Sequence, residues 1–236
     1  LQTAPDGLDP GLCSPVRNPI PVRRPTHPAP FCALAGLLLL LALSPASAFT
    51  TVVIDAGHGG HDRGGIPGQR IAEKDMALDV SRRLEGYLRD AGVRTVMTRR
   101  TDVFVPLASR VAIANRQRDA VFVSIHFNSA RREGAAGAET FYYSPGGLRL
   151  ASTIQNELVR TVSIENRGVK RRGFYVLRNS QIPAVLVECG FLTNGAEARR
   201  IGQSRHRDRL AREIAGAVMD CRGRSRFRTG ALQVSR

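Results

Sequence analysis

The chain has 236 residues, 42% of them apolar, which suffices for one ordinary domain with a core and short tails. Its formal net charge of +15 favours an anionic partner, but nucleic acid, a membrane face and an acidic cell-wall polymer all fit that charge. Aromatic residues make up only 6%, whereas single-stranded nucleic-acid binders place aromatic side chains among their basic ones. We therefore expect no nucleic-acid partner.

The first 48 residues have the composition of an export leader. Residues 1–30 hold most of the chain's 13 prolines and are not expected to pack. Arg23 and Arg24 precede an apolar run at 31–43, and the small residues of 46–48 follow a proline. The run is shorter than the ~20 residues of a membrane-spanning helix. We expect a signal peptide, a periplasmic or extracellular protein, and no permanent membrane span in its mature form.

The rest of the chain divides into a folded segment, 49–221, and a basic tail, 222–236. The tail contains arginines, no acidic residue and no apolar period, which is typical of a disordered arm. The folded segment keeps two cysteines, Cys189 and Cys221, too few for a disulfide scaffold. We expect both to be reduced, with a bridge between them as the alternative.

Within 49–221, the apolar pattern alternates between the period of strands and the period of helices. The expected strands are 51–57, 93–99, 120–127, 138–144, 173–178 and 184–191. The expected helices are 73–91, 106–118, 147–162 and 206–221. The pattern at 138–144 is that of an edge strand. This order predicts a single α/β domain, a three-layer sandwich whose sheet has about six strands, is largely parallel but mixed, and is flanked by helices.

Four side chains suited to metal chemistry lie where these elements begin or end. His58 follows the first strand in VVIDAGHGGHDRGG, and Glu73 opens the first helix. His126 ends the third strand in VFVSIHFNS, and Glu188 ends the sixth in VLVECGF. Because ligands bind beyond the carboxyl ends of parallel strands, we expect the four to meet at one edge of the sheet. Two imidazoles and a carboxylate form a common catalytic zinc set, which needs one further carboxylate as general base.

Each of the four has a structural alternative. His58 could be an ordinary loop histidine, His126 a hydrogen-bonded core histidine, and Glu73 an acid that interacts favourably with the helix dipole. Glu188 is the most informative, because a carboxylate that ends a buried apolar strand is costly unless it is paired or bound to a metal.

Three further reactive side chains are interpreted as structural. His61 and His206 are expected to be solvated. Cys189 lies beside Glu188, but its place in a buried strand predicts an inert thiol rather than a nucleophile.

The segment from Val52 to about Cys221 resembles the zinc-dependent N-acetylmuramoyl-L-alanine amidases, the bacterial cell-wall amidases of type 3. The matching pieces, in order, are VVIDAGHGG, AEKDMALDV, TRRTDVFVPLASRVAIAN, VFVSIHFNS, GFYVLRNSQIPAVLVECGFLTN and the closing helix. Ala56 stands where the family often has proline. The resemblance implies one catalytic Zn²⁺ with the ligands His58, Glu73 and His126. It also implies that Glu188 is the catalytic carboxylate.

The resemblance further implies the reaction, which is hydrolysis of the amide between N-acetylmuramic acid and L-alanine in peptidoglycan. The substrate is then a glycan strand with its stem peptide. A secreted zinc carboxypeptidase is one alternative, but that class usually places its first His and Glu within three residues, unlike His58 and Glu73. The other alternative is a non-enzymatic cationic module that binds the cell wall.

Some members of this family carry an extra helix that plugs the zinc site until a partner protein removes it. The two long connections, FNSARREGAAGAETFYY and VSIENRGVKRRGF, lack the length and the apolar stripe of such a helix. We therefore expect a monomer that needs no obligatory activator and is held near the anionic wall partly by its basic tail.

Overall fold

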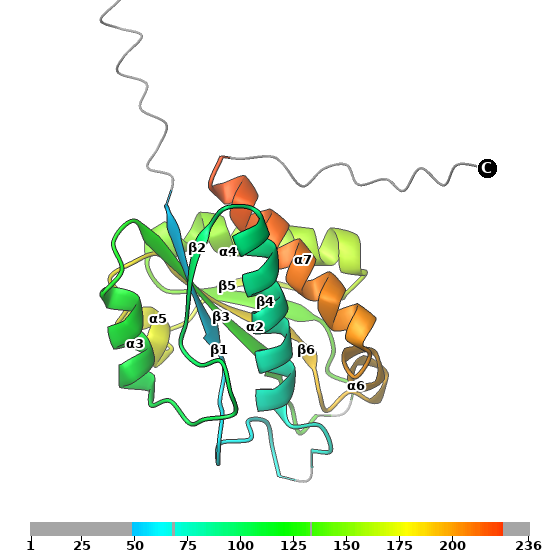
Figure 1. Ribbon diagram of the computed structural model, residues 1–236. Coiled ribbons are helices and arrows are strands. Elements are labelled where there is room, and N and C mark those ends of the chain that lie inside the picture. The colour runs from blue at the N-terminus through cyan, green and yellow to red at the C-terminus, as the bar shows by residue number, and fades with distance from the viewer. Residues whose placement is uncertain (1–48, 68, 133, 224–236) are drawn as a thin grey trace, which may run out of the picture. The chain divides into compact units, whose positions relative to one another are not determined.

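The computed structural model describes residues 49–67, 69–132 and 134–223 (Figure 1). The expected leader, 1–48, and residues 224–236 of the expected tail lie outside the described residues. No helix in the described part of the chain is long and apolar enough to span a membrane.

One mixed sheet forms the centre of the fold, with the strand order β2-β1-β3-β6-β4-β5. Its strands are β1 (Thr51–Ala56), β2 (Arg94–Met97), β3 (Ala120–Asn128), β4 (Ala138–Tyr142), β5 (Asn166–Arg171) and β6 (Ala184–Phe191). Strands β2, β1, β3 and β6 are parallel, whereas β4 pairs antiparallel to β6 and parallel to β5. The carboxyl ends of β1, β3 and β6 therefore lie at the same edge of the sheet.

Helices cover both faces of this sheet, which confirms the predicted three-layer α/β sandwich (Figure 1). The helices in the described residues are α2 (Glu73–Asp90), α3 (Leu107–Asn115), α4 (Pro145–Val162), α5 (Tyr175–Arg178), α6 (Gly195–Ile201) and α7 (Ser204–Cys221). Helices α2, α4 and α7 pack on one face, with α7 against both of the others, and α3 and α5 pack on the opposite face. Because both faces are covered, the central strands are continuous apolar runs.

Two elements differ from the sequence-based expectation. The stretch 173–178 was predicted to be a strand, which is wrong, because Tyr175–Arg178 forms the helical turn α5 and buries Val176 and Leu177 against the sheet. The fifth strand is instead β5, a polar stretch of half-exposed residues that follows α4. As a result β4 lies between β6 and β5 rather than at an edge. The short helix α6 was not predicted.

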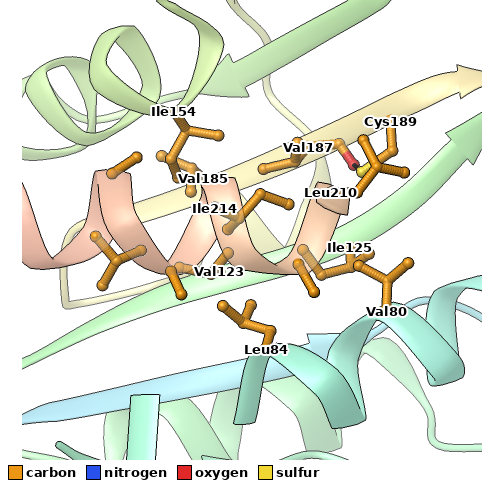
Figure 2. Packing of buried hydrophobic residues seen from close by; sticks show 14 of the residues in the cluster. Val80, Leu84, Val123, Ile125, Ile154, Val185, Val187, Cys189, Leu210 and Ile214 are labelled. Carbon is orange, nitrogen blue, oxygen red and sulfur yellow. Dashed lines mark hydrogen bonds between the residues drawn. The ribbon is translucent and has the colours of Figure 1, made fainter. Parts of the chain in front are cut away.

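The larger core cluster lies between the sheet and the helices α2, α4 and α7 (Figure 2). Ile214 on α7 is fully buried there and lies among side chains of the sheet and of the neighbouring helices, including Leu84 and Ile154. Cys189 is also fully buried in this cluster, and burial raises the pKa of its thiol. Cys189 and Cys221 are both free in this structure.

Truncation of Ile214 tests this packing. We expect Ile214→Ala to lower the free energy of unfolding by about 2–5 kcal/mol, because the substitution leaves a cavity between α7 and the sheet. Leu148→Ala is the matched control, since Leu148 is 43% exposed on α4 and its loss should cost within about 0.5 kcal/mol. Urea unfolding of both variants measures the difference, and equal losses would contradict the described core.

Candidate metal centre

His58, Glu73 and His126 meet at the carboxyl edge of the sheet. Each offers a ligand atom, and these atoms all lie within 4.8 Å of one another. His58 is in the loop after β1, Glu73 is the first residue of α2, and His126 is near the end of β3. The structure thus brings together the three residues that the sequence proposed as metal ligands.

The Glu73 carboxylate lies between the two imidazoles. Its Oε2 is 3.1 Å from Nε2 of His58, and its Oε1 is 2.8 Å from Nδ1 of His126. The backbone N–H of Phe127 also donates to Oε1, over 3.0 Å. Burial alone would raise the pKa of Glu73, but the hydrogen bonds from His126 and His58 lower it to about 2. Glu73 is therefore ionised at neutral pH.

Glycines make this close approach possible. A Cβ atom on Gly57 would lie 2.4 Å from Cε1 of His126, and one on Gly64 would lie 2.6 Å from Oε2 of Glu73. His58 itself has a φ of 58°, in the left-handed region that few residues other than glycine adopt. The glycine-rich loop after β1 thus lets the backbone pass directly against the imidazole and carboxylate groups.

A buried ion pair between Asp55 and Arg110 fixes the backbone of the glycine-rich loop after β1. Nη1 of Arg110 donates to Oδ1 of Asp55 over 2.7 Å, and both side chains are almost fully buried. Arg110 also donates to the carbonyl oxygens of Ala56 and His58, over 2.6 Å each. Burial would raise the pKa of Asp55, but the Arg110 guanidinium and hydrogen bonds from Ser124 and Thr98 lower it below its usual value. The backbone that carries His58 is therefore tied to the core of the sheet.

Asp62 orients His58 from the solvent side. Its Oδ2 lies 2.8 Å from Nδ1 of His58, and its Oδ1 accepts from the backbone N–H of Gly64 over 3.0 Å. Burial would lower the pKa of His58, but contacts with Glu73 and Asp62 raise it. A carboxylate on one ring nitrogen is the arrangement that directs the other nitrogen of a histidine toward a metal. Asp62 was not predicted from the sequence, although its spacing from His58, HxxxD, is present in the glycine loop.

Glu188 faces the same group from β6. It pairs in register with His126 of β3 and with Glu139 of β4. Its Oε2 atom is buried and has no hydrogen-bond partner among the described residues. Burial raises the pKa of Glu188 well above its usual value, and the nearby carboxylates of Glu73 and Glu139 raise it further. An unpaired buried carboxylate beside a cluster of metal-ligand side chains is suited to exchange protons with a bound substrate.

The three candidate ligands and Glu188 line one cleft of about 600 Å³. The opposite wall of the cleft is apolar and consists of residues before and within α3 and α5, among them Phe104, Leu107, Phe174 and Tyr175. Each of these four is more than 40% exposed, so the wall is open to a ligand. The cleft therefore offers a polar floor and an apolar side to the same molecule.

The other two histidines considered in the sequence lie outside the group of three. His61 is exposed, as predicted, and its ring packs on Phe104 at 4.2 Å between centroids. His206 on α7 is half-buried rather than solvated, and burial together with three neighbouring arginines lowers its pKa to about 4. Neither side chain joins the candidate metal centre.

The donor set fits zinc. Imidazole nitrogen and carboxylate oxygen are its usual ligands besides thiolate, and three protein ligands leave a position for water or substrate. An α/β sheet with such a centre at its carboxyl edge, beside a free carboxylate, defines the class of the metal-dependent amide hydrolases. The profile of one such family, described as N-acetylmuramoyl-L-alanine amidase, matches residues 52–220. The chain belongs to this family, which is generally zinc-dependent.

Individual relatives agree with this assignment. The uncharacterized protein YqiI of Bacillus subtilis (strain 168) is 40% identical over 194 residues, which cover 79% of this chain and 93% of that protein. The N-acetylmuramoyl-L-alanine amidase LytC of the same strain is 36% identical over 168 residues, or 70% of this chain and 34% of LytC. The solved catalytic domain of CwlV, an N-acetylmuramoyl-L-alanine amidase from Bacillus (Paenibacillus) polymyxa var. colistinus, has a TM-score of 0.70 and 32% identity, covering 73% of this chain and 97% of that domain.

The unpaired, buried carboxylate of Glu188 is expected to affect how the stability of the fold depends on pH. Because folding raises its pKa above the unfolded value of ~4.3, its ionisation destabilises the fold increasingly as the pH rises above that value. In metal-free protein we therefore expect Glu188→Gln to be more stable than the parent at pH 8, by about 1–3 kcal/mol. Below pH ~4 the two proteins should converge. Urea unfolding at a series of pH values checks this, and a variant that is less stable at pH 8 would contradict it.

Proposed function

We propose that this chain hydrolyses the amide between N-acetylmuramic acid and L-alanine in peptidoglycan, with one zinc ion held by His58, Glu73 and His126. The observation that carries the proposal is the convergence of the three ligand atoms, within 4.8 Å, in a cleft that the free carboxylate of Glu188 also lines. Family membership supports the reaction. The HxxE spacing of the carboxypeptidase alternative is absent, and nothing in the cleft favours a purely binding role.

Zinc held at this centre would supply Lewis-acid chemistry, which polarises a carbonyl and lowers the pKa of water toward neutrality. Asp62 accepts the hydrogen bond of His58 Nδ1 and so turns Nε2 toward the centre. Glu73 is kept ionised by its two histidine contacts. Arg110 holds the carbonyl of His58, which keeps the loop from shifting when substrate binds.

Glu188 is proposed as the general base. Its raised pKa gives it affinity for a proton, and its buried oxygen has no competing hydrogen bond among the described residues. It would take the proton from the attacking water and return it to the leaving amine of L-alanine. Amide resonance makes the carbonyl a poor electrophile, and an amine leaves readily only when its nitrogen is protonated, so both activation of the carbonyl and proton return are needed for the bond to break.

The remaining parts of the proposal concern the whole protein. We propose that residues 1–48 direct export as a leader and signal peptide, that 49–221 is the catalytic domain, and that 222–236 is a basic tail that favours the anionic wall. We also propose a monomer without an obligatory activator. Two observations support the lack of an obligatory activator: the described residues between Asn128 and Ala138 contain no helix, and the cleft is open to solvent.

Two substitutions separate metal binding from catalysis. Glu188→Gln should retain zinc at the parent's stoichiometry and lose about 10²–10⁴-fold in turnover, because only the base is removed. His126→Ala should lose both zinc and turnover, because one of three ligands is gone. Elemental analysis and turnover of a soluble muropeptide measure both properties. If Glu188→Gln stays within a few-fold of the parent, Glu188 is not the base.

Mass spectrometry of the products tests which bond is cut. Purified protein incubated with a defined muropeptide should release an intact stem peptide with a free L-alanine amine. A chelator should abolish the release and added Zn²⁺ should restore it. Cleavage within the peptide would instead identify a peptidase, and sedimentation with insoluble wall without any product would identify a binding module.

A further inference from the structure

A second hollow lies next to the candidate metal cleft, and its chemistry is different. It measures about 640 Å³, and its lining, as far as the described residues form it, includes four arginines, Arg70, Arg131, Arg132 and Arg199, and no acidic residue. We call it the arginine hollow. All four arginines are exposed, and none of their guanidinium groups makes a hydrogen bond or ion pair with another of the described residues.

The arginine hollow is built from the segments adjacent to the candidate site residues. Residues 66–71 precede Glu73, 130–132 follow His126 at the end of β3, and 192–199 follow Glu188 at the end of β6. Ile66 lines both the metal cleft and the arginine hollow. The two spaces are therefore neighbours along the same edge of the sheet.

Hydrogen bonds join these segments into one wall. The backbone N–H of Ala130 donates to Thr193 Oγ1 over 3.1 Å, which connects the segments after β3 and β6. Ser129 Oγ donates to Gln69 Oε1 over 2.5 Å, which connects the segment after β3 to the one before α2. The arginines thus project from a joined surface rather than from three independent loops.

Four neighbouring cations that have no anionic partner among the described residues repel one another, so a ligand that supplies negative charge would stabilise this arrangement. The planar guanidinium group is suited to bind carboxylates through two parallel hydrogen bonds. The other wall of the metal cleft presents the apolar side chains of Phe104, Leu107, Phe174 and Tyr175. The guanidinium of Arg110 also lines the cleft, but it is buried and already paired with Asp55. An anionic part of the substrate is therefore directed to the arginine side.

We propose that the arginine hollow is a binding site for the free carboxylates of the stem peptide, beyond the L-alanine whose amide is cut. This inference rests on the proposed function and adds the orientation of the substrate: its anionic peptide extends over the arginine hollow while its scissile amide lies at the metal centre. An extended peptide advances about 3.3–3.6 Å per residue, so carboxylates a few residues past the scissile amide reach the neighbouring hollow.

The test uses the full chain and a triple variant, Arg131→Gln with Arg132→Gln and Arg199→Gln. The matched control replaces three other exposed arginines, Arg89→Gln with Arg118→Gln and Arg149→Gln. Their side chains make no hydrogen bond or ion pair with the described residues, and all three belong to the opposite edge of the sheet. Both variants lose the same charge, so a general electrostatic effect is equal in the two.

Two probes are compared, a muropeptide with free stem carboxylates and the same muropeptide with those carboxylates amidated. For the free-carboxylate substrate, the triple variant should raise KM about tenfold and leave kcat unchanged, which corresponds to the loss of a charge-assisted hydrogen bond. The effect should shrink with added salt. For the amidated substrate, and for the control variant, KM should stay within about twofold of the parent.

Calorimetric binding of the free-carboxylate and amidated stem peptides gives a readout that does not depend on turnover. The parent should bind the free-carboxylate peptide about tenfold more tightly, and the triple variant should bind both peptides alike. Equal binding by parent and triple variant would overturn the proposal, as would a triple variant that loses only its binding to insoluble wall, which would identify an anionic wall polymer as the ligand. If the parent binds the peptide selectively but cleaves neither muropeptide, the proposed function fails while the peptide site stands.

Discussion

The buried ion pair between Asp55 and Arg110 connects the sheet, the helix α3 and the loop that carries His58. Asp55 is buried near the end of β1 and accepts hydrogen bonds from Thr98, just after β2, and from Ser124, its partner within β3. Arg110 comes from α3 on the other side and binds the backbone of His58. Removing either partner would leave an uncompensated charge in the core, which is among the most destabilising changes a protein can undergo. The sheet, the helix α3 and the glycine-rich loop that carries His58 therefore depend on one another.

The sequence was sufficient to predict the fold class and the residues that meet at the sheet edge, for a physical reason. His126 and Glu188 each end an apolar run of a central strand, where a polar side chain has few explanations other than a paired or metal-binding role. His58 follows a third such run. Parallel strands place these ends together whatever the details of the loops, so the pattern alone sufficed to predict that they lie near one another.

Other features depend on contacts that no local pattern reveals. β5 is a polar edge strand with half-exposed residues, so it has no apolar alternation to detect. The stretch around Tyr175 contains aromatic and β-branched residues typical of strands, yet Val176 and Leu177 become buried as part of a helical turn. Asp62 and Arg110 acquire their roles only through partners, His58 and Asp55, that the fold brings to them. Long-range contacts thus determine the structure of these segments and the partners of these side chains, which local propensity cannot predict.

The in-register pairing of β3 with β6 has a consequence for how this enzyme can diversify. His126 and Glu188 are Cα partners in adjacent strands, which are separated by about 4.8 Å wherever they pair. Their spacing is therefore a property of the backbone ladder and is insensitive to sequence change elsewhere. The segments 66–71, 130–132 and 192–199 lie outside that ladder and carry the arginines. In the proposed role of the arginine hollow, exchange of these surface segments alters which peptide is accepted, while the relative position of histidine and carboxylate is inherited unchanged.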